Sequence, residues 1–265
     1  MNSIKKQKAV LFFYAKKISL CRYFFLPVKK EQFFFDSFNG RSYTCSPKYL
    51  YLYLTEHGIA KPENCIWTCR DKDSFRKQIG DERVKLVEYG SKEYIKACMT
   101  SRILIINVFL LSIIPIRKNQ CLINTWHGQA YKTIGMADLS DQYVAKKQAF
   151  TAKAKQTKYF LSTCSQFSEI LFDSLYISHK KIIPSGLPRN DFLYSTTKMK
   201  NLSIIIENLC AKIQKLRGKN LADKIVVLYA PTCRTSNGQV IDLEKNILPV
   251  NKIRLNSTNK LKYML

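Results

Sequence analysis

The sequence predicts an α/β fold built on a parallel, doubly wound sheet. Short apolar runs typical of buried strands alternate along the chain with longer segments that have helical spacing. Hydrophobic residues make up 46% of the 265 residues, which is enough for a sizeable core. A chain of this length can hold one complete domain and part of a second.

The expected strands are short apolar or β-branched runs, most of them closed by a glycine, a proline or a polar turn. In chain order they cover residues 33–38, 65–68, 84–87, 103–108, 121–123, 159–162 and 181–184. The first ends at Asn39-Gly40, a turn signal. The fourth opens a longer apolar run that continues to Ile116 and is too short to span a bilayer.

Helices are expected between these strands. The segment 47–57 has tyrosines and leucines at helical spacing, with Gly58 just past its end. Ser91 is placed to cap a helix that runs to about Met99. Further on, the segment 139–158 predicts a long basic helix, and Ser165 begins another that ends at about Leu175.

We expect three parts in the chain: a basic amphipathic segment over 1–30, a Rossmann-like domain over 31–198, and the start of a second domain over 199–265. The polar residues 196–201 mark the second boundary. A helix over 202–216 and a strand over 225–229 follow it. About 30 residues remain, too few for a second domain of ordinary size, so we expect the chain to be cut short there.

The charge balance points to a polyanionic partner. There are 44 Lys and Arg against 19 Asp and Glu, a formal net charge of +25. Nucleic acid, an anionic membrane surface and a phosphate-rich substrate all fit this excess. The nine cysteines are expected to be reduced, as in a cytosolic protein, and no convincing secretory signal is present.

The first thirty residues mix aromatics with cations and allow two interpretations. A basic, aromatic-rich amphipathic segment suits an interfacial membrane helix. An ordinary first element that packs on the core and exposes a basic face fits the same pattern.

Three loops carry the chemistry, and each follows an expected strand. Asn124-Thr125-Trp126-His127-Gly128 holds one of only three histidines, and open α/β folds bind ligands at such strand ends. A neutral imidazole there can accept a proton from an attacking hydroxyl, although a lone histidine can also be structural.

In the second loop, 186–191, Arg189 can pair with phosphate oxygens; an Arg189–Asp191 ion pair is the alternative. The third loop, 230–234, offers Thr232 and Arg234 to a phosphate. The sequence shows neither paired histidines on a helix nor clustered carboxylates, so no metal site is expected. A glycine-rich nucleotide loop is also absent.

Several motifs, in order, give a resemblance to the CDP-glycerol glycerophosphotransferases of teichoic acid and related capsule synthesis. The resemblance covers about residues 31–235 and rests on Phe35-Asp36-Ser37-Phe38-Asn39-Gly40-Arg41-Ser42-Tyr43, Ser46-Pro47-Lys48-Tyr49, Asn124-Thr125-Trp126-His127-Gly128 with Lys132, Gly186-Leu187-Pro188-Arg189-Asn190-Asp191, and Leu228-Tyr229-Ala230-Pro231-Thr232-Cys233-Arg234.

The resemblance implies a glycosyltransferase-B-like fold with two Rossmann-like halves. It also implies peripheral attachment to the cytoplasmic face of the membrane, with an anionic membrane surface rather than nucleic acid as the partner. The implied reaction moves a polyol phosphate, glycerol phosphate above all, from CDP-glycerol to a hydroxyl of a lipid-linked polyol-phosphate acceptor. CMP leaves, and the resemblance implies no cofactor.

The same resemblance assigns roles to residues. His127 would be the base, and Lys132 an additional phosphate contact. The donor's phosphates and glycerol would be lined by Trp126, His127, Gly128, Gln129, Ala130, Arg189, Pro231 and Thr232.

Two departures from the family pattern are Gln129-Ala130, where Thr-Pro is usual, and Cys233, where a bulky aromatic is usual. The family's C-terminal half, with a second catalytic histidine, has no counterpart after Arg234. Two alternatives therefore stay open: a non-catalytic remnant that keeps the membrane-binding N-terminal domain, and a basic nucleic-acid-binding protein.

Overall fold

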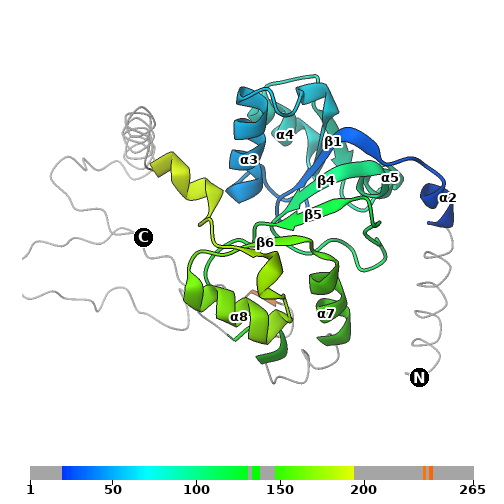
Figure 1. Cartoon of the computed structure of the whole chain (residues 1–265). Helices are drawn as coiled ribbons and strands as arrows, with labels where there is room; N and C mark the ends of the chain where they lie inside the picture. Colours follow the sequence, from blue (N-terminus) through cyan, green and yellow to red (C-terminus); the bar gives the residue numbers. More distant parts are fainter. Residues whose placement is uncertain (1–19, 131–132, 138–146, 194–234, 237–238, 241–265) are drawn as a thin grey trace, which may run out of the picture. The chain divides into compact units, whose positions relative to one another are not determined.

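The computed structural model describes residues 20–130, 133–137, 147–193, 235–236 and 239–240 (Figure 1). The chain divides into two compact units, residues 1–195 and 196–265. In the second unit the described residues form a small antiparallel pair, β8 (Thr235–Ser236) with β9 (Gln239–Val240).

A parallel sheet of seven strands forms the centre of the first unit. Its spatial order is β3-β2-β1-β4-β5-β6-β7, and every adjacent pair is parallel. The strands are β1 (Lys29–Asp36), β2 (Cys65–Cys69), β3 (Lys85–Glu88), β4 (Ser101–Ile106), β5 (Cys121–Asn124), β6 (Tyr159–Leu161) and β7 (Ile182–Ile183). The predicted α/β fold with a parallel sheet is confirmed.

Helices make most of the connections between the strands, as is usual in a parallel sheet, whereas residues 107–120 join β4 to β5 without a helix. The helices are α2 (Cys21–Phe24), α3 (Cys45–Glu56), α4 (Lys72–Ile79), α5 (Lys92–Thr100), α7 (Lys147–Gln156) and α8 (Ser165–Leu175). Short 3-10 turns cover Pro62–Asn64, Gly135–Ala137, His179–Lys181 and Pro188–Leu193. No helix in the described part of the chain is long and apolar enough to cross a membrane.

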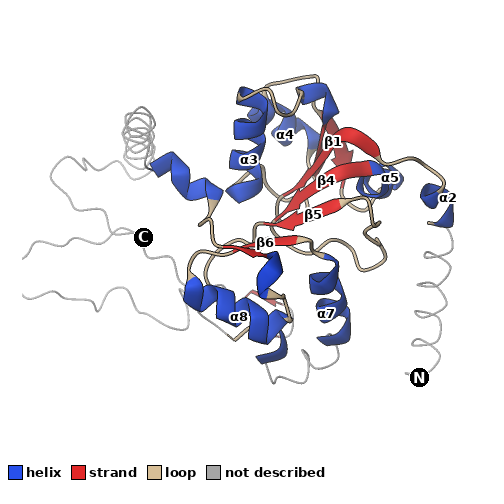
Figure 2. Cartoon of the chain, in the orientation of Figure 1, coloured by secondary structure: helices blue, strands red, loops and turns tan. Residues whose placement is uncertain are grey.

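Alternating side chains of β1, a strand drawn in red in Figure 2, pack into the cores on opposite faces of the sheet. Phe34 packs into a cluster with Tyr94 of α5, with ring centroids 5.6 Å apart. Phe35, on the opposite face, stacks on Trp67 at 5.2 Å, in a cluster that also holds Tyr51 of α3. The sheet is therefore covered by helices on both faces, which is the doubly wound arrangement.

The predicted elements match the observed ones closely where a cap or a turn marks the boundary. Ser91 caps α5 by accepting a hydrogen bond from the Tyr94 backbone N–H at 3.1 Å, as predicted. Helix α8 has the predicted bounds. Helix α4 was not predicted, because its eight residues are mostly charged or polar and only two of them, Phe75 and Ile79, form its apolar face.

The first strand differs from the prediction at both ends. It begins at Lys29, since exposed lysines there pair in the sheet without giving an apolar signal. It stops at Asp36, because Phe38 and Asn39 turn into the left-handed region with φ values of 52° and 57°. Glycine is required next: Gly40 has φ 69°, and a Cβ there would lie 2.9 Å from the Thr68 methyl group.

Other predicted elements are shorter than expected or lie outside the described residues. Of the expected helix 139–158, residues 147–156 are helical and 138–146 are outside the described residues. The expected helix 202–216 and strand 225–229 also lie outside them. In the first thirty residues, Leu20 and Tyr23 are buried in the core cluster of α5, while Phe24 and Phe25 are exposed.

Candidate active site

The carboxyl ends of β1, β4 and β5 lie side by side where the sheet's strand order reverses. Strand β1 has β2 on one side and β4 on the other. The chain therefore adds β2 and β3 in one direction from β1, and then adds β4 to β7 in the opposite direction. Open α/β sheets form their ligand crevices at such a position. The residues that follow these three strands are Ser37-Phe38, Asn107 and Thr125-Trp126-His127.

His127 is exposed, and its ring orientation is set by three neighbours. Its Nδ1 lies 2.9 Å from the backbone carbonyl oxygen of Asn107. The Phe38 ring meets it edge-on with centroids 5.8 Å apart, and the Trp126 ring stacks at 4.6 Å. Because a carbonyl only accepts hydrogen bonds, this contact favours the tautomer with the proton on Nδ1 and a free lone pair on Nε2.

The residues before His127 anchor the loop. The Asn124 side-chain oxygen accepts a hydrogen bond from the Trp126 N–H at 2.8 Å, and the Thr125 N–H donates to the Ile106 carbonyl at 2.8 Å. Trp126 takes a left-handed φ of 53°, and its buried indole packs against Phe160. Burial of the indole together with the tight turn directs the next side chain, His127, outward.

Asn107 joins the ends of two strands. Its carbonyl contacts His127, and its side-chain oxygen accepts a hydrogen bond from the Phe38 N–H at 2.8 Å. Its side-chain nitrogen donates to the Ser37 hydroxyl at 3.4 Å. The sequence prediction missed this residue, because Asn107 falls inside the expected strand 103–108. The available signal in the sequence was a lone asparagine inside an apolar run. The structure buries this residue fully, and a buried amide needs hydrogen-bond partners.

Asp36 lies beneath this edge and is almost fully buried. Its Oδ1 accepts a hydrogen bond from the Gly40 N–H at 3.1 Å, and its Oδ2 has no partner among the described residues. Burial raises its pKa to about 7, against the opposing effects of backbone hydrogen bonds from Gly40 and Asn39 and of the Arg70 charge. The sequence prediction did not identify this carboxyl as part of the site's support.

Arg189 reaches the His127 loop from the turn Pro188–Leu193. Its Nη1 donates to the His127 carbonyl oxygen at 3.1 Å and lies 3.4 Å from the Cys45 sulfur. An ion pair with Asp191, the alternative drawn from the sequence, is not found in the part of the chain that the structure describes. A Cβ at Gly128 would lie 3.8 Å from Arg189 Nη2, an ordinary contact distance, so the approach of Arg189 does not itself require a glycine; the φ of 154° at this position does favour one.

The structure thus brings the two described candidate loops together. Trp126, His127 and Gly128 lie beside Arg189, and the Gln129 amide lies 3.6 Å from the Cys164 sulfur. Ala130 packs partly buried beside the Trp126 cluster. Lys132, Pro231 and Thr232 lie outside the described residues. Among those that are described, no group of three metal-binding side chains gathers.

Relatives of this chain are enzymes of teichoic acid synthesis. It is 28% identical over 215 residues to the teichoic acid poly(glycerol phosphate) polymerase of Bacillus subtilis (strain 168), which covers 79% of this chain and 27% of that protein. The teichoic acid glycerol-phosphate transferase of Staphylococcus aureus is 28% identical over 211 residues, covering 77% of this chain and 51% of that protein. The chain therefore spans about a quarter to half of the length of these relatives.

Solved structures of the wall teichoic acid polymerase TagF have the same fold. One TagF variant superposes with a TM-score of 0.67 at 23% identity, covering 88% of this chain and 57% of that one. A TagF structure soaked with CDPG gives a TM-score of 0.65 at 22% identity, with coverage of 88% and 58%.

The sequence profile of one family, CDP-glycerol:poly(glycerophosphate) glycerophosphotransferase, matches residues 19–264, nearly the whole chain. With the parallel sheet and the histidine loop at its carboxyl edge already described, this match places the chain in that family.

Proposed function

We propose that this chain transfers glycerol phosphate from CDP-glycerol to a hydroxyl of a lipid-linked polyol-phosphate acceptor, releasing CMP. The observation that carries the proposal is His127, which sits at the strand-order reversal with Nδ1 bonded to the Asn107 carbonyl. An exposed Nε2 lone pair at such a crevice suits a general base. Family membership supports the donor and the reaction class.

In the proposed step, the acceptor hydroxyl oxygen attacks the glycerol-bearing phosphorus of CDP-glycerol. The hydroxyl proton passes to His127 Nε2 as the new P–O bond forms. The bond between that phosphorus and the bridging oxygen breaks, and its electron pair leaves with CMP. Enzymes speed such transfers mainly by positioning the reactants and by stabilising charge on the phosphoryl oxygens.

Arg189 supports this step in two ways. Its Nη1 bond to the His127 carbonyl holds the loop that carries the base. Its Nη2 and Nε donate no hydrogen bond to another described residue. Both nitrogens are therefore available to the donor's phosphate oxygens. Trp126, Gly128, Gln129 and Ala130 are proposed to line the same donor phosphates and glycerol.

The rest of the proposed machinery follows the family. Residues 199–265, with Pro231 and Thr232, are proposed to begin the second half of a glycosyltransferase-B-like fold, and Lys132 to contact a phosphate. We place the enzyme peripherally on the cytoplasmic face of the membrane. The net charge of +25 supports an anionic surface and a polyphosphate acceptor as partners.

The direct test is His127→Gln in the full chain, assayed by CMP release from CDP-glycerol with a synthetic lipid-linked glycerol phosphate acceptor. We expect the rate to fall by roughly 10²- to 10⁴-fold, the usual contribution of a general base. His57→Gln is the matched control, because His57 also places Nδ1 2.9 Å from a backbone carbonyl, that of Tyr53 at the end of α3. Full turnover by His127→Gln would exclude His127 as the base.

Calorimetric titration of the 265-residue chain with CDP-glycerol tests the donor site separately. Saturable binding in both the native chain and His127→Gln would support a complete donor site. A folded chain that binds no CDP-glycerol would instead support the alternative of a non-catalytic remnant.

A further inference from the structure

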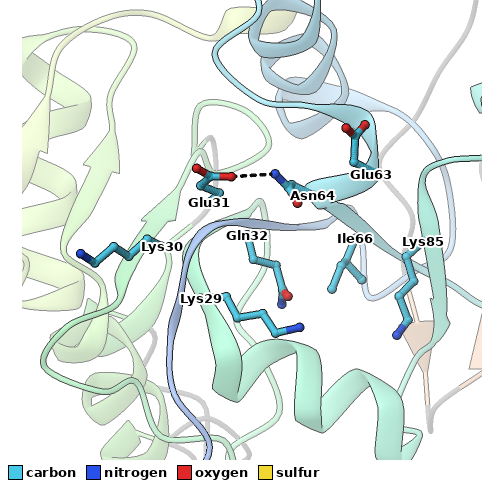
Figure 3. Close-up of a pocket in the computed structure, with 8 residues that line it drawn as sticks. All are labelled: Lys29, Lys30, Glu31, Gln32, Glu63, Asn64, Ile66 and Lys85. Carbon is cyan, nitrogen blue, oxygen red and sulfur yellow. Dashed lines mark hydrogen bonds between the residues drawn. The ribbon is translucent and has the colours of Figure 1, made fainter.

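A groove lies at the amino ends of β1, β2 and β3, the sheet edge opposite His127. One hollow of about 480 Å³ is lined by Lys29, Gln32 and Lys85 among others (Figure 3). A second hollow of about 240 Å³ shares these three residues and extends along α5 past Lys92 and Lys96. The two hollows share lining residues and so adjoin each other, and together they are called the lysine groove below.

Cations outnumber carboxylates in the lining of the lysine groove, which holds Lys29, Lys30, Lys85, Lys92 and Lys96 against Glu31, Glu63 and Glu93. Within the part of the chain that the structure describes, Lys29, Lys85, Lys92 and Lys96 form no ion pair. Glu93 is the carboxylate that lines the second hollow. A hydrogen bond to its own backbone N–H, with further help from Ser91 and nearby lysines, lowers the pKa of Glu93 and holds its charge at the start of α5.

Side-chain directions concentrate this charge. In Figure 3, Lys29, Gln32 and Lys85 point to the same side of the strands, whereas Lys30 points away. On α5, Lys92 and Lys96 are four residues apart and so lie one above the other, with Cβ atoms about 5–6 Å apart. Besides Lys30, four lysines therefore line the lysine groove, which suits a ligand that carries more than one negative charge.

The floor of the groove is fixed. Ile66 and Tyr23 are buried, and Gln32 donates hydrogen bonds to the hydroxyls of Ser101 at 2.8 Å and Thr100 at 3.3 Å. The side-chain carbonyl oxygen of Gln32 receives no hydrogen bond from another described residue. An acceptor held among four lysines is suited to a hydroxyl that neighbours a phosphate.

We propose that the lysine groove binds a phosphodiester-linked polyol, with lysines on the phosphates and Gln32 on a hydroxyl. The inference deepens the proposed function and rests on it, because that reaction makes such a polymer. The aromatic residue of the groove, Tyr23, is buried, so bases of a nucleic acid have no stacking surface there. A glycerol phosphate chain and the headgroup of an anionic glycerophospholipid share this chemistry.

The position of the groove gives the polymer a second point of attachment. It lies at the opposite end of the strands from His127, so a chain held there stays bound when its growing end leaves the catalytic edge. Two linked contacts raise the effective concentration of the free end at the site. The groove would thus favour repeated addition to one chain over release after each unit.

The test compares Lys29→Gln/Lys85→Gln with the matched double variant Lys77→Gln/Lys180→Gln in the full chain. Lys77 and Lys180 are exposed and lie outside the groove, so both variants lose the same charge. Thermal unfolding of each variant verifies that the fold is retained. The probes are a synthetic glycerol phosphate hexamer, titrated by calorimetry, and phosphatidylglycerol vesicles, followed by co-sedimentation against phosphatidylcholine vesicles.

We expect the groove variant to bind the phosphodiester probe about tenfold more weakly than the control variant, with a smaller salt dependence. Weaker binding of the hexamer alone identifies the polymer as the ligand. Weaker binding of the vesicles alone identifies the lipid headgroup as the ligand, and either result supports the site. Equal binding by the two variants overturns it. His127→Gln should bind both probes normally, so this result is independent of whether His127 is the base.

Discussion

The imidazole of His127 is exposed but held on three sides. The Asn107 carbonyl fixes Nδ1, the Phe38 and Trp126 rings flank the ring, and Arg189 holds the His127 carbonyl. Exposure is needed for a proton to reach the base, whereas fixed geometry is needed for the base to be aligned. At this scale the supporting contacts matter as much as the histidine itself.

Asn107→Ala tests whether the Asn107 side chain helps to hold the His127 ring in place. The Phe38 N–H would lose its side-chain acceptor, and we expect the free energy of unfolding to fall by about 1–3 kcal/mol, the usual cost of an unsatisfied buried donor. The Phe38 turn would then hold the His127 ring less firmly, so ¹⁵N NMR of the imidazole should show a mixture of the two neutral tautomers. In the native chain we expect the Nδ1–H tautomer alone.

Gln120→Ala is the control for that experiment. Gln120 is also a buried amide at a strand end, donating to the carbonyls of Cys98 at 2.7 Å and Ser101 at 2.6 Å, but at the opposite edge of the sheet. The Gln120→Ala substitution should lower the free energy of unfolding by a comparable amount and leave the His127 tautomer unchanged. A pure Nδ1–H signal in Asn107→Ala would show that the Asn107 side chain plays no part in orienting His127.

The sequence singled out His127 more readily than the residues that hold it. His127 stood out because histidine is rare in this chain and because it follows an apolar strand. Arg189 was identified for its guanidinium, but its bond to the His127 carbonyl joins residues 62 positions apart. Asn107 contacts His127 through its backbone carbonyl and Phe38 contacts it through its ring, and no local sequence pattern predicts a contact between separate loops.

At the scale of elements, the turn after β1 determines how the site is built. Phe38, Asn39 and Gly40 take three successive left-handed φ values of 52°, 57° and 69°, and the Gly40 N–H bonds to the Asp36 carboxyl. Two non-glycine residues in this region cost roughly 1–2 kcal/mol each, so the surrounding contacts must offset that strain. Asp36 and Asn107 supply these contacts from inside the sheet.

Asp36→Asn should change how stability depends on pH. The native pKa of about 7 lies above the ordinary value of 3.8, so between these pH values the folded state holds a proton that the unfolded state has released. The free energy of unfolding should therefore fall as pH rises through this window. The decline contributed by this group is at most about 4 kcal/mol.

In the asparagine variant that contribution is absent, while the side-chain oxygen still accepts from the Gly40 N–H. Urea unfolding of both proteins across the window should give a flatter profile for Asp36→Asn, and the variant should be the more stable protein above pH 7. Parallel profiles for the two proteins would contradict a buried, protonated Asp36.

Element boundaries were predictable where one residue imposes them. The Ser91 cap, the α8 bounds and the Asn39-Gly40 turn all rest on local backbone preferences. The start of β1 and helix α4 were not predictable, because each depends on pairing or packing with distant segments. Lys29, for example, is in the sheet because it pairs with Ser101 of β4.

For the whole molecule, the described hydrophobic core lies in the first unit. Among the described residues, its three hydrophobic clusters are formed by residues between Leu20 and Ile182, and the seven-stranded sheet ends at Ile183. The fold class was predictable because alternating strands and helices with short connections allow few arrangements. The two ends of the strands carry the two proposed sites, His127 at the carboxyl end and the lysine groove at the amino end.

This organisation predicts that residues 1–195 fold without residues 196–265. Both tryptophans of the chain, Trp67 and Trp126, are buried in the first unit, so their fluorescence reports on that unit alone. Urea unfolding of the 265-residue chain and of residues 1–195, followed by tryptophan fluorescence, should give cooperative transitions whose free energies agree within about 1 kcal/mol. The shorter chain should also retain the ¹⁵N signal of the Nδ1–H tautomer of His127, because the described contacts that fix its ring come from residues 38–126. A non-cooperative transition in residues 1–195 would mean that the second unit is needed to complete the first. A cooperative transition with an altered tautomer would instead mean that the second unit helps to shape the catalytic edge.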